Sequence, residues 1–217
     1  MKQVYLDNAA TTPMSPTVID VITDEMANDF GNASSTHTLG RKARNSVETA
    51  RHTIAQAINA KDQEIIFTSG GSESNNTVIF GVAEMQKAVG RHLITTKIEH
   101  ESVLKSMQHL EELGYEVTYL DVDRDGHISL DQLREAIRPD TILVSVMAVN
   151  NEVGSINPLK DIGQIVKDSQ AFFHVDAVQG LGNIDLDVEE MGIDFMSTSA
   201  HKINGPKFLG FLYERDG

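Results

Sequence analysis

The sequence predicts one α/β domain whose largely parallel sheet is covered by helices on both faces. From residue 64 onward, short apolar runs alternate with stretches of helical periodicity, which is typical of strand–helix–strand units. The run 141–149 is apolar almost throughout, as expected for a strand buried on both faces. A length of 217 residues with 40% hydrophobic residues is sufficient for one substantial core.

Composition excludes several classes of protein. A formal net charge of −14 argues against nucleic acid or an anionic membrane as the main partner. The chain has no cysteine, so it has no disulfide framework and no thiolate metal site. The N-terminus reaches Asp7 before a signal-length apolar segment develops, and the run 142–149 is too short to span a bilayer. We therefore expect a cytoplasmic location.

The first sixty residues predict an N-terminal segment and two helices. Residues 5–13 begin like a strand and continue as small polar residues. Ser15 and Pro16 are typical of an N-cap and a first helical position. The apolar stripe expected on that helix consists of Val18, Ile19, Ile22 and Met26. A loop at 29–35 then leads to a helix over 41–60.

The remaining residues predict alternating strands and helices. The expected strands cover 64–68, 92–96, 115–120, 141–149, 171–175, 194–198 and 208–213. The expected helices cover 74–88, 102–113, 130–137 and 159–167, with a short one near 188–190.

Polar clusters follow five of these strands. Ligands of parallel sheets bind at the carboxyl ends of the strands, so we expect the clusters to face one cleft. The clusters are 69–72, 99–101, 150–152, 176–179 and 199–202.

Lys202 is the candidate nucleophile of this cleft. A lysine at a sheet edge loses part of its solvation, which lowers its pKa and favours Schiff-base chemistry. Considered alone, a solvated lysine on a turn is the more common situation. The glycine pair Gly70 and Gly71 precedes a helix and could admit an anion, although such pairs are often only steric requirements. A serine nucleophile elbow is disfavoured because the second flanking glycine of that motif is missing.

Asp176 and His100 are the other chemically informative residues. A carboxylate at the end of an apolar strand needs a partner, and a protonated pyridine nitrogen is a suitable one; a helix cap or salt bridge is the alternative. His100 could stack on an aromatic cofactor and move protons, or could be an ordinary loop histidine. His174 and Asp176 share a strand face without a third ligand nearby in sequence, so we expect no metal site. Residues 121–129 match the start of a calcium loop, but a strand precedes them, and we interpret them as a strand–turn–helix connection.

Six segments together resemble the cysteine desulfurases of the NifS/IscS type, which belong to the class V aminotransferase family and use pyridoxal 5′-phosphate (PLP). The resemblance extends in order through essentially the whole chain. The segments are 5–13, 68–76, 99–100, 149–154, 174–179 and 199–202.

The resemblance implies a fold and a set of residue roles. The fold is the large domain of the fold type I PLP-dependent transferases. Lys202 corresponds to the lysine that forms a Schiff base with PLP, Asp176 to the partner of the pyridine nitrogen, and His100 to the stacking and proton-transferring residue. The remaining implied cofactor ligands are Gly71, Ser72, Ser199 and His201 for the phosphate and Asn151 and Gln179 for the phenolic oxygen.

The family reaction converts L-cysteine to L-alanine and leaves the sulfur as a persulfide on an enzyme cysteine. The sulfur then passes to an iron–sulfur cluster scaffold or a tRNA-thiolation enzyme, and full-length members are homodimers. This chain has no cysteine and ends shortly after Lys202. We therefore expect residues 1–217 to be an incomplete PLP-binding large domain, without its C-terminal part and small domain, and to be inactive in persulfide formation alone.

Two alternatives remain from the sequence. One is a different class V activity, such as a selenocysteine lyase or an aminotransferase. The other is a catalytically inactive interaction module that binds a sulfur-transfer partner or a full-length homologue.

Overall fold

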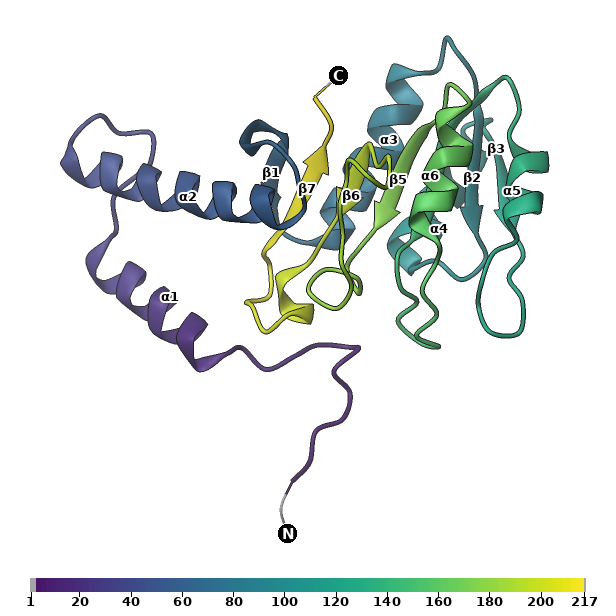
Figure 1. The fold of residues 1–217 in the computed structure, drawn as a ribbon. Helices are drawn as coiled ribbons and strands as arrows, with labels where there is room; N and C mark the ends of the chain where they lie inside the picture. The colour runs from purple at the N-terminus through teal and green to yellow at the C-terminus, as the bar shows by residue number, and fades with distance from the viewer. Residues whose placement is uncertain (1–2, 217) are drawn as a thin grey trace.

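The computed structural model describes residues 3–216, and a single seven-stranded sheet organises them (Figure 1). The strand order is β1-β7-β6-β5-β4-β2-β3. Every pairing is parallel except those of β7, which runs antiparallel to both β1 and β6. The strands are β1 (Ile65–Thr68), β2 (His92–Thr96), β3 (Glu116–Leu120), β4 (Thr141–Met147), β5 (Phe172–Asp176), β6 (Phe195–Ser197) and β7 (Gly210–Glu214). The predicted mostly parallel α/β architecture is confirmed.

Helices cover both faces of the sheet. The pair α3 and α4 packs on one face and the pair α5 and α6 on the other, while α1 and α2 extend from the β1 side (Figure 1). The helices are α1 (Pro16–Asn28), α2 (Thr38–Ala57), α3 (Gly71–Met85), α4 (Glu101–Glu112), α5 (Leu130–Ala136) and α6 (Leu159–Lys167), with short 3-10 turns η1 (Asp62–Glu64) and η2 (Ala200–Lys202).

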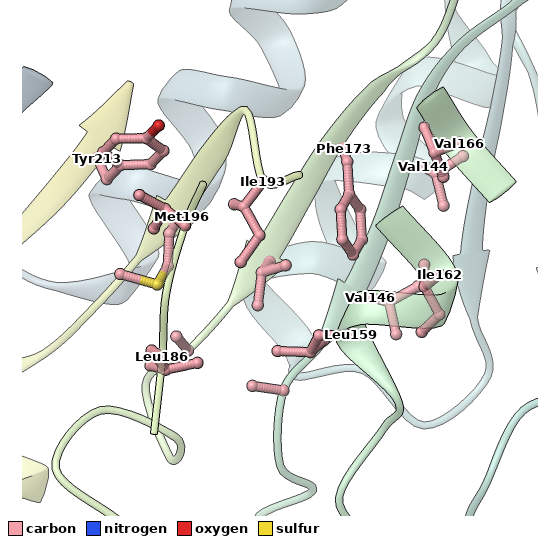
Figure 2. Packing of buried hydrophobic residues seen from close by; sticks show 14 of the residues in the cluster. Val144, Val146, Leu159, Ile162, Val166, Phe173, Leu186, Ile193, Met196 and Tyr213 are labelled. Carbon is pink, nitrogen blue, oxygen red and sulfur yellow. The ribbon is translucent and has the colours of Figure 1, made fainter. Parts of the chain in front are cut away.

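Each face of the sheet has its own apolar core. On the α6 face, Phe173 from β5 packs with Val144 and Val146 from β4 against Ile162 (Figure 2). Every residue of β4 is buried, which explains why its sequence is apolar rather than alternating. Because Phe173 and Val175 point to the α6 face, strand alternation directs His174 and Asp176 to the face of α3 and α4.

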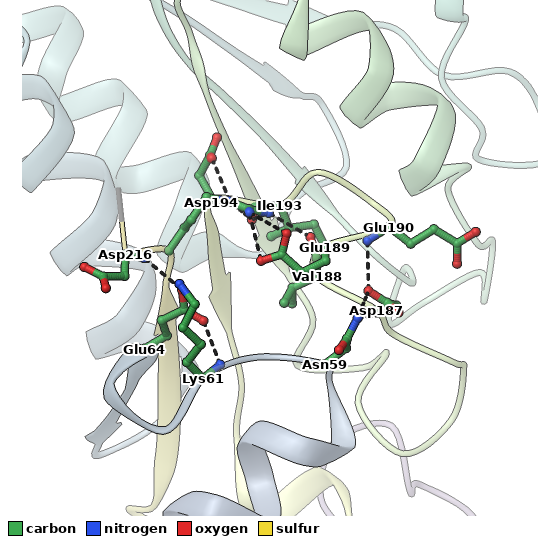
Figure 3. Close-up of polar contacts among 11 residues, drawn as sticks. Asn59, Lys61, Glu64, Asp187, Val188, Glu189, Glu190, Ile193, Asp194 and Asp216 are labelled. Carbon is green, nitrogen blue, oxygen red and sulfur yellow. Dashed lines mark hydrogen bonds and ion pairs between the residues drawn. The ribbon is translucent and has the colours of Figure 1, made fainter.

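A clamp holds the last strand against the loop before β6. Arg215 donates to the carbonyl oxygens of Val188 (3.0 Å) and Ile193 (2.9 Å) and pairs with the Glu189 carboxylate (2.9 Å). The backbone N–H of Asp216 donates to Glu64 (3.0 Å) in the same region (Figure 3). These bonds fix the position of the 188–194 loop, which leads into β6 and then Lys202.

Three expectations about secondary structure are wrong. Residues 5–13 form no strand, because their backbone N–H groups donate to Asp7 within the segment and to His201 of η2 rather than to a sheet edge. Residues 188–190 form a turn instead of a helix, because the Asp187 carboxylate accepts from the N–H of Glu190 (2.8 Å) and Val188 donates to Ile58. Helices α2 and α3 each begin and end three residues earlier than expected. For α3 the early start follows from Gly70, whose φ of 138° lets the chain turn from β1 directly into the helix.

Helix α1 forms as expected but its apolar stripe is not buried. Ser15 Oγ accepts from the N–H of Val18 (3.3 Å), and Pro16 is the first helical residue. None of the helix's residues is buried, and Met26 is 78% exposed. Ile19 and, just after the helix, Phe30 are exposed as well, so the helix and its end present apolar side chains to solvent.

Candidate active site

A cavity of about 550 Å³ lies at the carboxyl ends of the parallel strands, as the sequence predicted. The structure brings all the predicted site residues to its wall. They are Gly71, Ser72, His100, Asn151, Asp176, Gln179, Ser199, His201 and Lys202. A larger cavity of about 810 Å³ beside α2 contains none of them and is lined mainly by apolar side chains. The chemically active groups therefore converge in the smaller one.

Asp176 is a buried carboxylate at the end of β5, only 4% exposed. Its Oδ1 accepts from the N–H of Val178 (3.0 Å) and its Oδ2 from Asn75 Nδ2 (2.8 Å). Burial raises the pKa of this carboxyl, while the two hydrogen bonds and the charges of His100 and Lys202 lower it. The net effect raises the pKa of Asp176. No described cation forms an ion pair with it, so the buried carboxyl group has no direct counter-charge among the described residues.

Lys202 reaches the same cavity from η2, after β6. Its Nζ donates to the carbonyl oxygens of Ala10 (2.9 Å) and Ala9. Desolvation lowers the pKa of the amine, and the nearby carboxylates of Asp7 and Asp176 oppose that shift. A larger fraction of this amine is therefore neutral than for a solvated lysine.

His100 forms the N-cap of α4. Its Nδ1 accepts from the N–H of Ser102 (3.1 Å), which holds the ring against the first turn of that helix. The ring is exposed to the cavity rather than buried in the core.

The start of helix α3 offers the cavity an anion-binding feature. Gly70 provides no side-chain cap for α3, so the free first-turn amides at Gly71 and Ser72 are not covered by a capping side chain. Ser199 and His201 line the same cavity. Burial and the charges of Lys202 and Lys207 lower the pKa of His201.

Asn151 and Gln179 lie on loops that follow β4 and β5. Asn150 fixes the first loop, because its Oδ1 accepts from the N–H groups of Glu152 and Val153, both at 2.9 Å. Gln179 Nε2 donates to the carbonyl oxygen of Ala9 (2.7 Å).

The sequence placed the N-terminal arm, residues 5–13, in the family resemblance but assigned no role to its individual residues. Asp7, Ala9 and Ala10 line the cavity. The N–H of Thr12 donates to the His201 carbonyl (2.9 Å), and Thr12 Oγ1 accepts from the N–H of Asn204 (2.8 Å). These contacts join residues almost two hundred positions apart, so no local sequence signal reports them. Asn75, which holds Asp176, was also missed.

The two metal-like motifs have structural roles. His174 is fully buried between Ser145 Oγ (2.8 Å) and Ser197 Oγ (2.9 Å), and burial lowers its pKa to about 3. Asp123 accepts from the N–H groups of Asp125 and His127, both at 2.9 Å, and thereby closes its own turn between β3 and α5. The strand–turn–helix interpretation is confirmed. Within residues 3–216, no cluster of three or more metal-binding side chains is present, and no helix is long and apolar enough to cross a membrane.

Glycine 71 is expected to be intolerant of any side chain. A Cβ at this position would lie 2.4 Å from Val178 Cγ2 in the cavity wall, whereas a Cβ at Gly81 of the same helix would meet nothing within 4 Å. We expect Gly71→Ala to lower the free energy of unfolding by about 1–3 kcal/mol and Gly81→Ala to raise it by up to about 1 kcal/mol. Urea unfolding measures both, and equal stabilisation by the two variants would contradict the close contact.

Glu99 is expected to make stability depend on pH. Its carboxyl accepts from the N–H of Met147 (2.9 Å) and from Thr96 Oγ1 (2.8 Å), and burial, with the nearby Asp176 charge, raises its pKa from 4.5 to about 8. The folded chain therefore holds this proton between pH 4.5 and 8 while the unfolded chain releases it.

Raising the pH through that window should thus lower the free energy of unfolding, by a few kcal/mol in total at about 1.4 kcal/mol per pH unit. Glu99→Gln keeps the acceptor oxygen but does not titrate. From pH 5 to 8 the unfolding free energy of wild type should fall relative to that of the variant, because only wild type titrates at this position. A constant difference over that range would show that Glu99 does not titrate there.

The fold is that of the type I PLP-dependent transferases. The chain belongs to the aminotransferase class-V family, whose family model matches residues 4–217. The resemblance drawn from the sequence is confirmed at this level.

Two relatives similar to this chain are named cysteine desulfurases. The chain is 50% identical, over its full length, to the cysteine desulfurase IscS of Dictyoglomus turgidum, and covers 55% of that protein. It is 51% identical over 99% of its length to the mitochondrial cysteine desulfurase of Candida maltosa, and covers 44% of it. The chain therefore spans about half the length of the curated relatives it matches.

Solved structures agree with this assignment. A structure described as SspA in complex with cysteine superposes with a TM-score of 0.95 at 42% identity, over 99% of this chain and 62% of that one. A NifS-like protein superposes with a TM-score of 0.97 at 40% identity, over 100% of this chain and 60% of that one.

Proposed function

We propose that residues 1–217 belong to the PLP-binding large domain of a cysteine desulfurase of the NifS/IscS type. The observation that carries the proposal is that the Lys202 amine and the buried Asp176 carboxylate line one cavity. An amine and a carboxylate so placed suit the aldehyde and the pyridine nitrogen of PLP. The names of the relatives support the choice of L-cysteine as substrate.

The residues present fit PLP. The Asp176 carboxylate is buried without an ion-pair partner among residues 3–216, and a protonated ring nitrogen would supply its counter-charge. Asn75 also lines the cavity, and its buried Oδ1 has no hydrogen-bond partner among the described residues. The uncapped start of α3 offers amides to a phosphate.

Each predicted residue has a place in this proposal. Lys202 would carry the cofactor covalently, Asp176 would bind its ring nitrogen and His100 would lie against the ring. The phosphate would be held by Gly71, Ser72, Ser199 and His201, and the phenolic oxygen by Asn151 and Gln179. When bound, PLP supplies an aldehyde that takes the substrate's amino group and a ring that withdraws electrons from it.

The chain's own side chains prepare this chemistry. The lowered pKa of Lys202 keeps more of its amine neutral and nucleophilic. The Asp176 carboxylate, as an anion, would hold a proton on the ring nitrogen. His100 would receive or deliver protons from its ring nitrogen that faces away from α4.

The overall reaction proposed is the transfer of sulfur from L-cysteine to a thiol. The C–S bond of cysteine breaks, an S–S bond forms to the acceptor sulfur, and the β-carbon gains a proton to give L-alanine. Because these 217 residues contain no cysteine, the acceptor thiol must come from outside them. An iron–sulfur scaffold or a tRNA-thiolation enzyme would receive the sulfur, and the site of action would be the cytoplasm.

We also propose that the exposed apolar side of α1 contributes to a homodimer in the complete protein. Its side chains Ile19 and Met26, together with the nearby Phe30, are 48%, 78% and 76% exposed, an unfavourable arrangement for a surface that stays in water.

The test is to add PLP to the purified chain and record its absorbance, then add L-cysteine or L-selenocysteine. We expect a band near the visible edge that responds to L-cysteine, without persulfide formation by the chain alone. A response to selenocysteine only would favour a selenocysteine lyase. No band from the folded chain would contradict the proposal. Stable binding to a purified full-length desulfurase in that case would favour the interaction module.

A further inference from the structure

Four polar side chains form a continuous series of hydrogen bonds in the cavity wall. Asn75 Nδ2 donates to Asp176 Oδ2 (2.8 Å) and to Ser102 Oγ (2.9 Å). Ser102 Oγ lies 2.8 Å from His100 Nδ1. The series connects the end of β5 with α3 and with the start of α4, and all four residues line the cavity.

The chemistry of the donors fixes the direction of each bond. Asn75 must turn its NH₂ group toward Asp176, because its carbonyl oxygen would repel the carboxylate. That same NH₂ group donates to Ser102 Oγ, so the hydroxyl proton of Ser102 is available to His100 Nδ1. The backbone N–H of Ser102 donates to Nδ1 as well (3.1 Å). With two donors directed at it, Nδ1 acts as an acceptor, and the proton of the neutral ring lies on Nε2.

We propose that Asn75 and Ser102 are positioning residues that hold neutral His100 in the tautomer protonated at Nε2 and connect its ring to Asp176. The inference rests on the proposed function and deepens it. Nδ1 is occupied by the first turn of α4, so Nε2 is the ring nitrogen left for a molecule in the cavity. Neutral His100 therefore presents a hydrogen-bond donor, Nε2–H, toward that molecule.

Asn75 has a second effect, at the Asp176 end. It provides one of the two hydrogen bonds that this buried carboxylate receives, the other being the N–H of Val178. Asn75 is itself only 1% exposed. Its removal would leave the anion with a single donor in a region from which water is largely excluded.

The direct test is nitrogen NMR of the folded chain labelled with ¹⁵N-histidine, measured without PLP. The His100 signals are assigned by their loss in His100→Gln. We expect wild type to show Nδ1 as an acceptor and Nε2 as protonated. In Asn75→Ala and in Ser102→Ala, the ratio of this tautomer to the other should fall at least about fivefold, since each change weakens one neutral hydrogen bond.

Two controls separate positioning from general stability. Ser102→Thr keeps a hydroxyl and should preserve the wild-type tautomer. Asn76→Ala removes the neighbouring amide of α3, which bonds to the Ser72 carbonyl (2.7 Å) and to Ser106 (3.1 Å), and should leave the His100 signals unchanged. A wild-type ring protonated at Nδ1 would overturn the inference, as would an unchanged tautomer ratio in both alanine variants.

A second readout uses PLP itself as the probe, by equilibrium dialysis. Asn75→Ala should weaken PLP binding at least about fivefold, and Ser102→Ala less than about twofold, because Asn75 donates a hydrogen bond to Asp176 and Ser102 does not. The reverse order would overturn the assigned roles. If wild type binds no PLP, the proposed function fails, and the tautomer measurement still decides the present inference.

Discussion

Replacing Lys202 with alanine is expected to abolish covalent attachment of PLP to the chain. In the proposed function this amine is the nucleophile in the cavity, and desolvation lowers its pKa so that more of it is neutral than in a solvated lysine. The variant should lose the absorbance band near the visible edge completely and should lose PLP on gel filtration. Noncovalent binding through the remaining ligands should persist at a weaker affinity.

Lys207→Ala provides the matched control, because Lys207 lies five residues further on and its side chain is exposed. It should keep the band at full amplitude. A Lys202→Ala protein that retained the band would show that another amine holds the cofactor.

Replacing Asp176 with asparagine is expected to have opposite effects on stability and on cofactor binding. The carboxylate is buried and has no paired cation in the described part of the chain, so removing its charge should leave the unfolding free energy of the cofactor-free chain unchanged or higher. The same change removes the partner of the ring nitrogen. Loss of one member of a buried charge pair costs about 2–5 kcal/mol, so PLP should bind at least roughly thirtyfold more weakly.

Urea unfolding and equilibrium dialysis with PLP measure the two effects separately. Asp161→Asn, on the exposed side of α6, should change neither. An Asp176→Asn protein that bound PLP as tightly as wild type would contradict the assigned role of the carboxylate.

The parts of the fold that the sequence predicted well are those whose burial determines their composition. Helix α6 has the predicted bounds because its apolar residues Ile162 and Val166 pack on the sheet at helical spacing. Strand β4 is recognisable because both of its faces are buried. Helix α1 shows where this logic fails, because its apolar stripe predicts a buried face, whereas Val18 and Ile22 are only half-buried and Ile19 and Met26 are exposed in the described chain.

The candidate site was predictable to the extent that it follows from strand ends. The polar clusters after the parallel strands do converge, and all the proposed ligands line one cavity. Asn75 was not predictable, since its role depends on helix α3 starting at Gly71 and on side-chain directions that spacing does not give. The contacts of the N-terminal arm with His201 and Asn204 were also not predictable, because they are long-range hydrogen bonds without a local sequence pattern.

The most direct measurement is to treat the folded chain with PLP, reduce it with borohydride, digest it and locate the pyridoxyl group by mass spectrometry. Our account predicts one modified residue, Lys202. At limiting PLP, the Asp176→Asn protein should carry less of this modification than wild type, because it binds PLP more weakly. Labelling spread over exposed lysines, or concentrated at a lysine outside the cavity, would contradict it.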